Sequence, residues 1–285
     1  MSGVCSGVLH EEHVLLGASF SEGCDDLNVV RSYAAETSCR SLSDATFLAD
    51  LTGCLYELVG GPCASALIES ACCGAELSVG DVAFEGVLSG DGSVLSAPLV
   101  LRTGDEEYVV LDVSHRGPAL LGWMGFLRQI QQGGTTPFAQ TTLDDASGML
   151  VPLLLMGRSS HGILMDYLGS SETLPAPGKV CSLSLDAIPA LVAALPCEKG
   201  MHPGYLLLVP AARARVIWRS LLSFTEVNPV GHDALRAILC DTLPWGEALS
   251  AKGPVRVGRE QLGSWSLVRE TSDFIGARGL FAQED

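Results

Sequence analysis

Few residues in this sequence stand at spacings that would identify a chemistry. The histidines form neither a His-Glu-x-x-His pattern nor a metal-ligand spacing, so we predict no metal site. The Gly-x-Ser-x-Gly pattern of serine hydrolases and the phosphate-binding loop pattern are both missing from the sequence. The residues that could do chemistry must therefore be found through the elements that position them.

Ten cysteines are scattered along the chain without a Cys-x-x-Cys pair. The adjacent pair Cys72-Cys73 is open to metal or redox chemistry. The alternative is a helix end built from small residues at 69–74, and we favour it because unpaired cysteines commonly serve as small core residues. We expect reduced and mostly buried thiols.

The composition indicates a globular protein with a large apolar core. The chain has 285 residues, 47% of them hydrophobic, with a mean hydropathy of +0.32, enough for one large or two ordinary domains. Only 18% of the residues are charged, yet the net charge is -16, which disfavours nucleic acid and anionic membranes as partners. No apolar run reaches about 18 residues, the length that indicates a spanning helix, and no basic segment leads into an apolar one at the amino terminus. We predict a cytoplasmic protein.

The stretch Phe84–Val113, which we call the meander, shows the predicted architecture most clearly. Apolar runs at 84–88, 94–101 and 108–113 are separated by Ser-Gly-Asp-Gly and Thr-Gly-Asp-Glu, residues that favour chain reversal. We expect three antiparallel strands followed by a helix over Pro118–Ile130.

The rest of the chain alternates strands and helices in an order typical of an α+β protein, in which antiparallel sheets are covered by helices. The polar, glycine-rich segment at 131–142 is the best candidate for a boundary. We therefore expect two consecutive α+β subdomains, 1–133 with the meander and 134–285.

Four blocks of sequence, in order from about residue 40 to 282, resemble the glycine-cleavage T-protein family, the tetrahydrofolate-binding aminomethyltransferases and their demethylase and oxidase relatives. The blocks are SLSDATFLADLTG with GPCASALIES, the meander, IPALVAALPCEKGMHPGYLLLVPAARARVIWRSLL, and PVGHDALR with SDFIGARGLFAQ. The resemblance implies the α+β fold of that family and a tetrahydrofolate cofactor. It also implies a further C-terminal barrel domain after the fourth block, which we expect to be absent here because the sequence reaches only Asp285.

The catalytic position that the resemblance implies is altered. Where the family has a pair of acids that lies beside the pterin and the reacting nitrogen, this sequence has Ser96 and Ala97. Neither side chain ionises at neutral pH, so electrostatic or general-base catalysis by this position is lost. Ser96 is the residue that replaces the family aspartate.

The resemblance also implies four cofactor-binding residues: Arg236, Glu198, Trp245 and Tyr205. Arg236 matches an arginine that can meet the folate glutamate tail, although a bridge to Asp233 or a helix end would also explain it. Glu198 could accept from the pterin edge, or it could be a solvated loop residue. Trp245 could cover a ring, or it could belong to the core.

Two functions from different classes follow. The first is tetrahydrofolate-dependent aminomethyl or methyl transfer, with a donor presented by a carrier protein, although the classical reaction of the family is not expected. The second is a non-catalytic relative that keeps the fold as a binding or assembly subunit, which the loss of the acids favours.

Overall fold

A computed structural model describes residues 6–22, 28–34, 45–196 and 202–282, and the chain divides into two compact units. Unit 1 combines Met1–Cys54 with Ala146–Thr242, and unit 2 combines Leu55–Asp145 with Leu243–Asp285. Each unit is therefore assembled from two separate segments. These bounds differ from the two consecutive subdomains, 1–133 and 134–285, that we expect from the sequence. That division of the chain stays a prediction.

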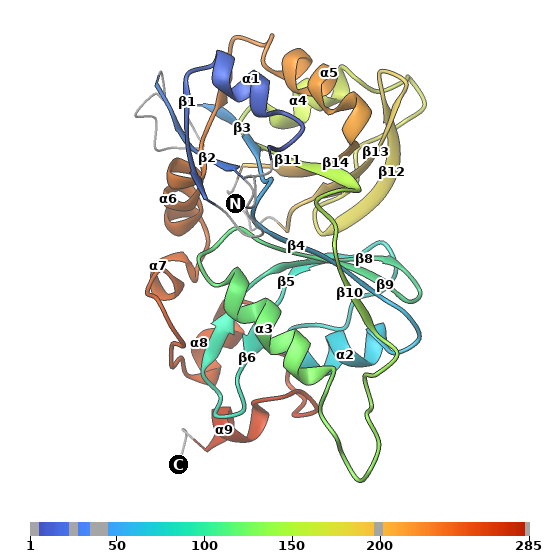
Figure 1. The fold of residues 1–285 in the computed structure, drawn as a ribbon, viewed down its shortest axis with the longest axis vertical. Coiled ribbons are helices and arrows are strands. Elements are labelled where there is room, and N and C mark those ends of the chain that lie inside the picture. Colours follow the sequence, from blue (N-terminus) through green and yellow to red (C-terminus); the bar gives the residue numbers. More distant parts are fainter. Residues whose placement is uncertain (1–5, 23–27, 35–44, 197–201, 283–285) are drawn as a thin grey trace, which may run out of the picture. The chain divides into compact units, whose positions relative to one another are not determined.

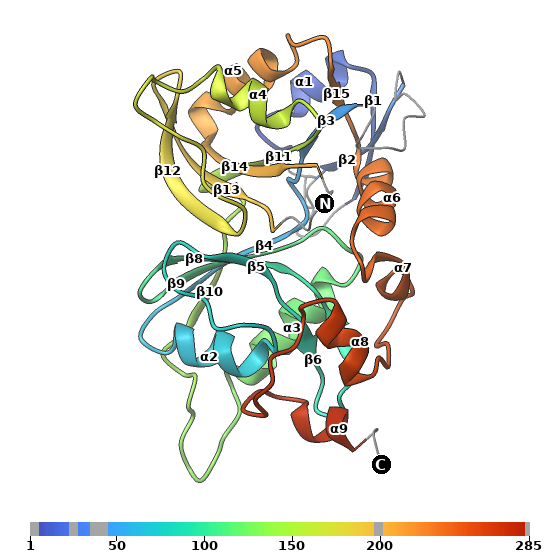
Figure 2. The ribbon, with the colours of Figure 1, turned by 180° about the vertical axis from the view of Figure 1, so that it is seen from behind.

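Unit 1 is built on a six-stranded sheet in the order β12-β13-β14-β11-β3-β15. The pairs are antiparallel except for β15 beside β3, and helices α4 and α5 pack on β11 and β14 (Figures 1 and 2). A hairpin of β1 and β2 and helices α1 and α6 complete the unit. The bounds are α1 His10–Leu15, β1 Ala18–Glu22, β2 Asn28–Tyr33, β3 Thr46–Asp50, β11 Leu150–Gly157, α4 Ser160–Met165, β12 Lys179–Leu185, β13 Ile188–Ala194, β14 Gly204–Pro210, α5 Ala211–Leu221, β15 Val227–Pro229 and α6 His232–Thr242.

Unit 2 is built on a five-stranded antiparallel sheet in the order β10-β4-β9-β8-β5, and helices α2 and α3 pack on it and on each other (Figure 1). A short hairpin of β6 and β7 and helices α7, α8 and α9 complete it. The bounds are β4 Leu55–Gly60, α2 Ala64–Ala71, β5 Val82–Phe84, β6 Val87–Leu88, β7 Val94–Ser96, β8 Leu99–Gly104, β9 Glu107–Asp112, α3 Gly117–Leu127, β10 Thr142–Asp145, α7 Gly246–Leu249, α8 Arg259–Ser264 and α9 Ala277–Phe281.

The α+β class is confirmed, and the meander forms strands where the sequence predicts them. The first two runs are each divided in two, however, because the chain leaves the main sheet after β5 and rejoins it at β8. Pro98, which has no backbone N–H, stands at the second break, and its carbonyl accepts from the Glu85 amide at 2.9 Å. The hairpin β6–β7 turns at Gly92, whose φ of +81° suits glycine.

Apolar side chains from the sheets and their helices fill the interior of each unit. Trp218 of α5 and Leu153 and Leu207 of the sheet lie in the core of unit 1. Leu67 of α2 and Leu120 of α3 lie against the five-stranded sheet in unit 2. Among the described residues, no helix has the length and apolar character needed to cross a membrane.

Candidate functional site

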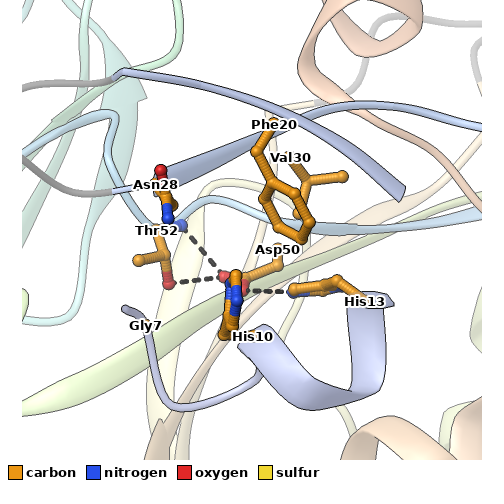
Figure 3. A pocket seen from close by; sticks show the side chains of 8 residues that line it. All are labelled: Gly7, His10, His13, Phe20, Asn28, Val30, Asp50 and Thr52. Carbon is orange, nitrogen blue, oxygen red and sulfur yellow. Dashed lines mark hydrogen bonds and ion pairs between the residues drawn. The ribbon is translucent and has the colours of Figure 1, made fainter. Parts of the chain in front are cut away.

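Asp50, the last residue of β3, is the centre of a buried polar network in unit 1. Its Oδ2 accepts from His13 Nε2 at 2.9 Å, and its Oδ1 accepts from the Thr52 amide at 2.9 Å and the Thr52 hydroxyl at 2.7 Å (Figure 3). His13 Nδ1 in turn lies 2.8 Å from the hydroxyl of Tyr33. Three segments of unit 1, namely α1, β2 and the end of β3, therefore meet in this network.

These contacts decide the charge of Asp50. Burial alone would raise the pKa of this carboxyl, but the hydrogen bonds from His13 and Thr52 hold its pKa below the ordinary value of 3.8. The carboxylate stays ionised at neutral pH. The pocket beside it, lined also by His10, Phe20 and Asn28, has space for about one water-sized molecule, so it does not accept a cofactor ring.

The backbone of Asp50 positions the helix that carries Arg236. His232, the first residue of α6, donates from Nε2 to the Asp50 carbonyl at 2.9 Å. Burial lowers the pKa of His232, so this imidazole is neutral at pH 7. Asp233, which the sequence offered as a possible partner of Arg236, accepts from Arg31 at 2.7 Å. Arg236 itself is half-buried on α6.

A second buried carboxylate lies in unit 2, beside the position where the sequence lost its acids. Ser96 at the end of β7 donates to Asp112 Oδ2 at 2.5 Å, and the Ser114 amide donates to Asp112 Oδ1 at 2.8 Å. Ser96 and Asp112 are 1% and 4% exposed. The carboxyl group that Ser96 lacks is thus present on its neighbour, at the end of β9.

Arg116, two residues after Ser114, fixes the segment that leads into α3. Its guanidinium donates to the carbonyls of Leu249 at 2.9 Å, Leu95 at 3.0 Å and Ala251 at 2.6 Å. Burial lowers the pKa of Arg116, and the nearby charge of Asp112 opposes that effect. The sequence before Pro118 indicates only the end of a strand, so the hydrogen bonds of Arg116 were not predicted.

The predicted site residues are distributed between the two units. Arg236 and Tyr205 belong to unit 1, where Tyr205 is buried on β14 with its hydroxyl 2.7 Å from His161 Nδ1. Ser96 and Trp245 belong to unit 2, where Trp245 is 7% exposed and packs edge-on against Phe84 at 5.2 Å. Glu198 lies outside the described residues. Cofactor contacts by all four candidate residues stay predictions.

Asp112, Asp50 and His13 were not predicted as site residues from the sequence. A signal for Asp112 was present, because one acid interrupts the apolar run of β9. Among the described residues, no group of three or more His, Cys, Asp or Glu side chains is placed to hold a metal ion.

Comparisons with known proteins identify the fold. No protein-family model matches the sequence, and a sequence search of curated proteins finds no match. Among solved structures, the glycine cleavage system aminomethyltransferase T from Bartonella henselae is 17% identical, with a TM-score of 0.71 over 99% of this chain and 75% of that chain. The heterotetrameric sarcosine oxidase from Corynebacterium sp. U-96 is also 17% identical, over 87% of this chain and 97% of that chain, at a TM-score of 0.40. The chain therefore has the fold of aminomethyltransferase T.

Proposed function

We propose that this chain binds tetrahydrofolate and takes part in the transfer of an aminomethyl or methyl group. The observation that carries the proposal is the likeness to aminomethyltransferase T, which extends over 99% of the chain. A cytoplasmic setting suits the free cysteines among the described residues, such as Cys54 and Cys72. The donor would be a small amine or a group presented by a carrier protein.

Asp112 is the residue to which we assign the electrostatic role in this proposal. A buried carboxylate stabilises a cationic, iminium-like carbon more strongly than a solvated one, because little water screens it. Ser96 and the Ser114 amide orient the carboxylate through hydrogen bonds of 2.5 and 2.8 Å. Ser96 is then a positioning residue, and the reaction differs from one that uses the two acids of the family.

Titration calorimetry with tetrahydrofolate tests the proposal directly. We expect binding in the micromolar range and a clear loss of affinity in Arg236→Ala, because an arginine can pair with the folate carboxylates. Arg213→Ala removes an exposed arginine of α5 in the same unit and serves as the charge-matched control. An absence of heat and of competition at high micromolar ligand rules out folate binding.

The second candidate is a non-catalytic binding or assembly subunit. The observation that favours it is Ser96 itself, a buried hydroxyl bound to Asp112 where the resemblance implies an acid. The Asp112→Asn variant separates the two functions. It should keep tetrahydrofolate affinity and lose transfer if the chain is an enzyme, whereas an assembly subunit would show no transfer even with the native carboxylate.

A further inference from the structure

Glu85, between β5 and β6 in unit 2, is a buried carboxyl group without a side-chain hydrogen-bond donor among the described residues, and the donor beside it is the backbone amide of Gly74. The side chain is 1% exposed, and neither carboxyl oxygen has an aligned partner among the described residues. A buried polar group that makes no hydrogen bond lowers the stability of the fold. Such a group is either an unfavourable feature of the protein or part of a binding site. The surroundings of Glu85 distinguish these two explanations.

The chain makes room for this carboxyl group. Gly74 stands against it, and a Cβ at that position would clash with Glu85 Oε2. The carboxyl group lines a small pocket walled by Ile68, Cys72 and Tyr108, with space for about one water-sized molecule. A space of this size beside two unpaired acceptor oxygens fits a small molecule that carries hydrogen-bond donors.

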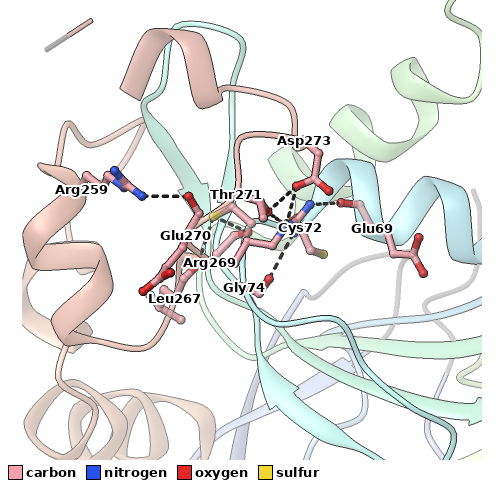
Figure 4. A network of polar contacts seen from close by, with 11 residues as sticks. Glu69, Cys72, Gly74, Arg259, Leu267, Arg269, Glu270, Thr271 and Asp273 are labelled. Atoms are coloured by element: carbon pink, nitrogen blue, oxygen red, sulfur yellow. Dashed lines mark hydrogen bonds and ion pairs between the residues drawn. The ribbon is translucent and has the colours of Figure 1, made fainter. Parts of the chain in front are cut away.

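The nearest cation is already occupied. Arg269 also lines the pocket, but its guanidinium donates to the carbonyls of Glu69 at 2.8 Å, Cys72 at 2.8 Å and Gly74 at 3.1 Å, and to Asp273 at 2.9 Å (Figure 4). These contacts hold residues after α8 against the end of α2. Arg269 therefore cannot turn to Glu85 without giving up the contacts that fix it.

The charges around the pocket favour a cation. The lining includes Glu69 and Glu76, which are both exposed, as well as Glu85, so acidic residues outnumber the one arginine, Arg269, around the pocket. Burial raises the pKa values of the neighbouring Cys72 and Cys73 thiols, which therefore stay neutral. We propose that the Glu85 pocket binds an ammonium-class cation, either the ammonium ion or the head group of a primary alkylammonium.

Binding at this site is coupled to a proton. Burial raises the pKa of Glu85 to about 8, and the Gly74 amide and Arg269 offset this only in part. A cation that donates to both oxygens favours the ionised carboxylate, so it releases a proton when it binds near neutral pH. The affinity should therefore be about 25-fold higher at pH 8.5 than at pH 6.5.

Thermal unfolding of the full chain in matched salts tests the site. At about ten times its dissociation constant, ammonium chloride should raise the unfolding midpoint by about 3 °C relative to sodium or tetramethylammonium chloride. Methylammonium chloride distinguishes the two sources, because it matches ammonium only if the pocket admits an alkyl group. Equal stabilisation by potassium would overturn the assignment of a hydrogen-bond donor. No ammonium-specific shift would leave an internal water as the occupant and overturn the proposal.

The Glu85→Gln variant should abolish the ammonium response, whereas Glu107→Gln, which removes an exposed carboxylate of β9, should keep it. Proton NMR with ¹⁵N-ammonium on the unmodified chain provides a test that does not depend on a variant folding. A bound ammonium signal protected from exchange with water is the expected result. A response that survives in Glu85→Gln would locate the cation elsewhere.

Discussion

Asp50 in unit 1 and Glu85 in unit 2 are both buried carboxyl groups, yet their pKa values move in opposite directions. Asp50 accepts three hydrogen bonds, from His13 and twice from Thr52, and its pKa lies below the ordinary value. Glu85 has no aligned donor, and burial raises its pKa to about 8. Burial alone therefore does not decide the charge of an acid, because the supply of donors can outweigh it. Substitutions of Asp50 or Glu85 test this contrast, and so do measurements on two other acids that accept hydrogen bonds, Asp112 and Asp91.

The largest effect is expected from Asp50→Ala. The change leaves the buried His13 and the half-buried Thr52 hydroxyl without their acceptor, and breaking a buried pair such as His13 and Asp50 costs about 4 kcal/mol of unfolding free energy. Urea unfolding at pH 7 measures it, with Asp166→Ala at an exposed acid after α4 as the control. A loss no larger than that of the control would show that the network does not stabilise unit 1.

Glu85→Gln should have the opposite effect. Because the folded-state pKa of about 8 lies above the ordinary value of 4.5, the unfolded chain binds fewer protons between those pH values. The stability contributed by protonated Glu85 is full below pH 4.5 and is lost as the pH rises toward 8. In ammonium-free buffer, the neutral amide should therefore stabilise the protein by roughly 3 kcal/mol at pH 7 relative to the native residue.

The same variant gives a pH signature. Urea unfolding of the native chain should show stability falling between about pH 5 and 8.5, and Glu85→Gln should flatten that fall. Asp50 has the reverse sign, since its contribution is present above the ordinary aspartate pKa of 3.8 and is lost as the pH falls through its lower folded-state value. An equal pH dependence in Glu85→Gln and the native chain would contradict the raised pKa.

Ser96→Ala tests Asp112, which accepts two hydrogen bonds and so has fewer donors than Asp50 and more than Glu85. Removing the hydroxyl leaves the Ser114 amide as its remaining donor and should cost about 1–2 kcal/mol. Ser264→Ala, at an exposed hydroxyl of α8, is the matched control for the denaturation experiment. If both variants lose the same amount, the 2.5 Å hydrogen bond contributes nothing to stability.

The smallest effect on stability is expected at Asp91, where donors act without burial. This exposed carboxylate in the β6–β7 turn accepts from the Ser89 hydroxyl at 2.6 Å and from the Ser93 amide at 3.1 Å, and these bonds lower its pKa to about 2. An NMR titration should place its midpoint near pH 2. A midpoint near the ordinary aspartate value would mean that donors lower a pKa only inside the protein.

Much of the fold could be predicted from the sequence, because turn residues and β-branched runs act locally. Asp91 and Gly92 mark the hairpin turn, and the apolar stretch of β9 marks a strand. The polar contacts could not be predicted in the same way. Ser96 and Asp112 belong to two different sheets, the β6–β7 hairpin and the five-stranded sheet, and Asp50 meets His13 37 residues away. The unpaired state of Glu85 depends on Gly74 and on the engagement of Arg269 with other acceptors.

The assembly of each unit from two segments has a consequence for synthesis on the ribosome. Unit 1 needs residues up to Thr242, and unit 2 needs both Leu55–Asp145 and the segment from Leu243 onward. Neither unit can close while the first half of the chain alone has emerged, so the usual order, in which an amino-terminal domain folds first, does not apply. The strands of the five-stranded sheet already have one another as partners within Leu55–Asp145, but Leu88 and Val94 of the β6–β7 hairpin pack against side chains from 245–280, which are synthesised last.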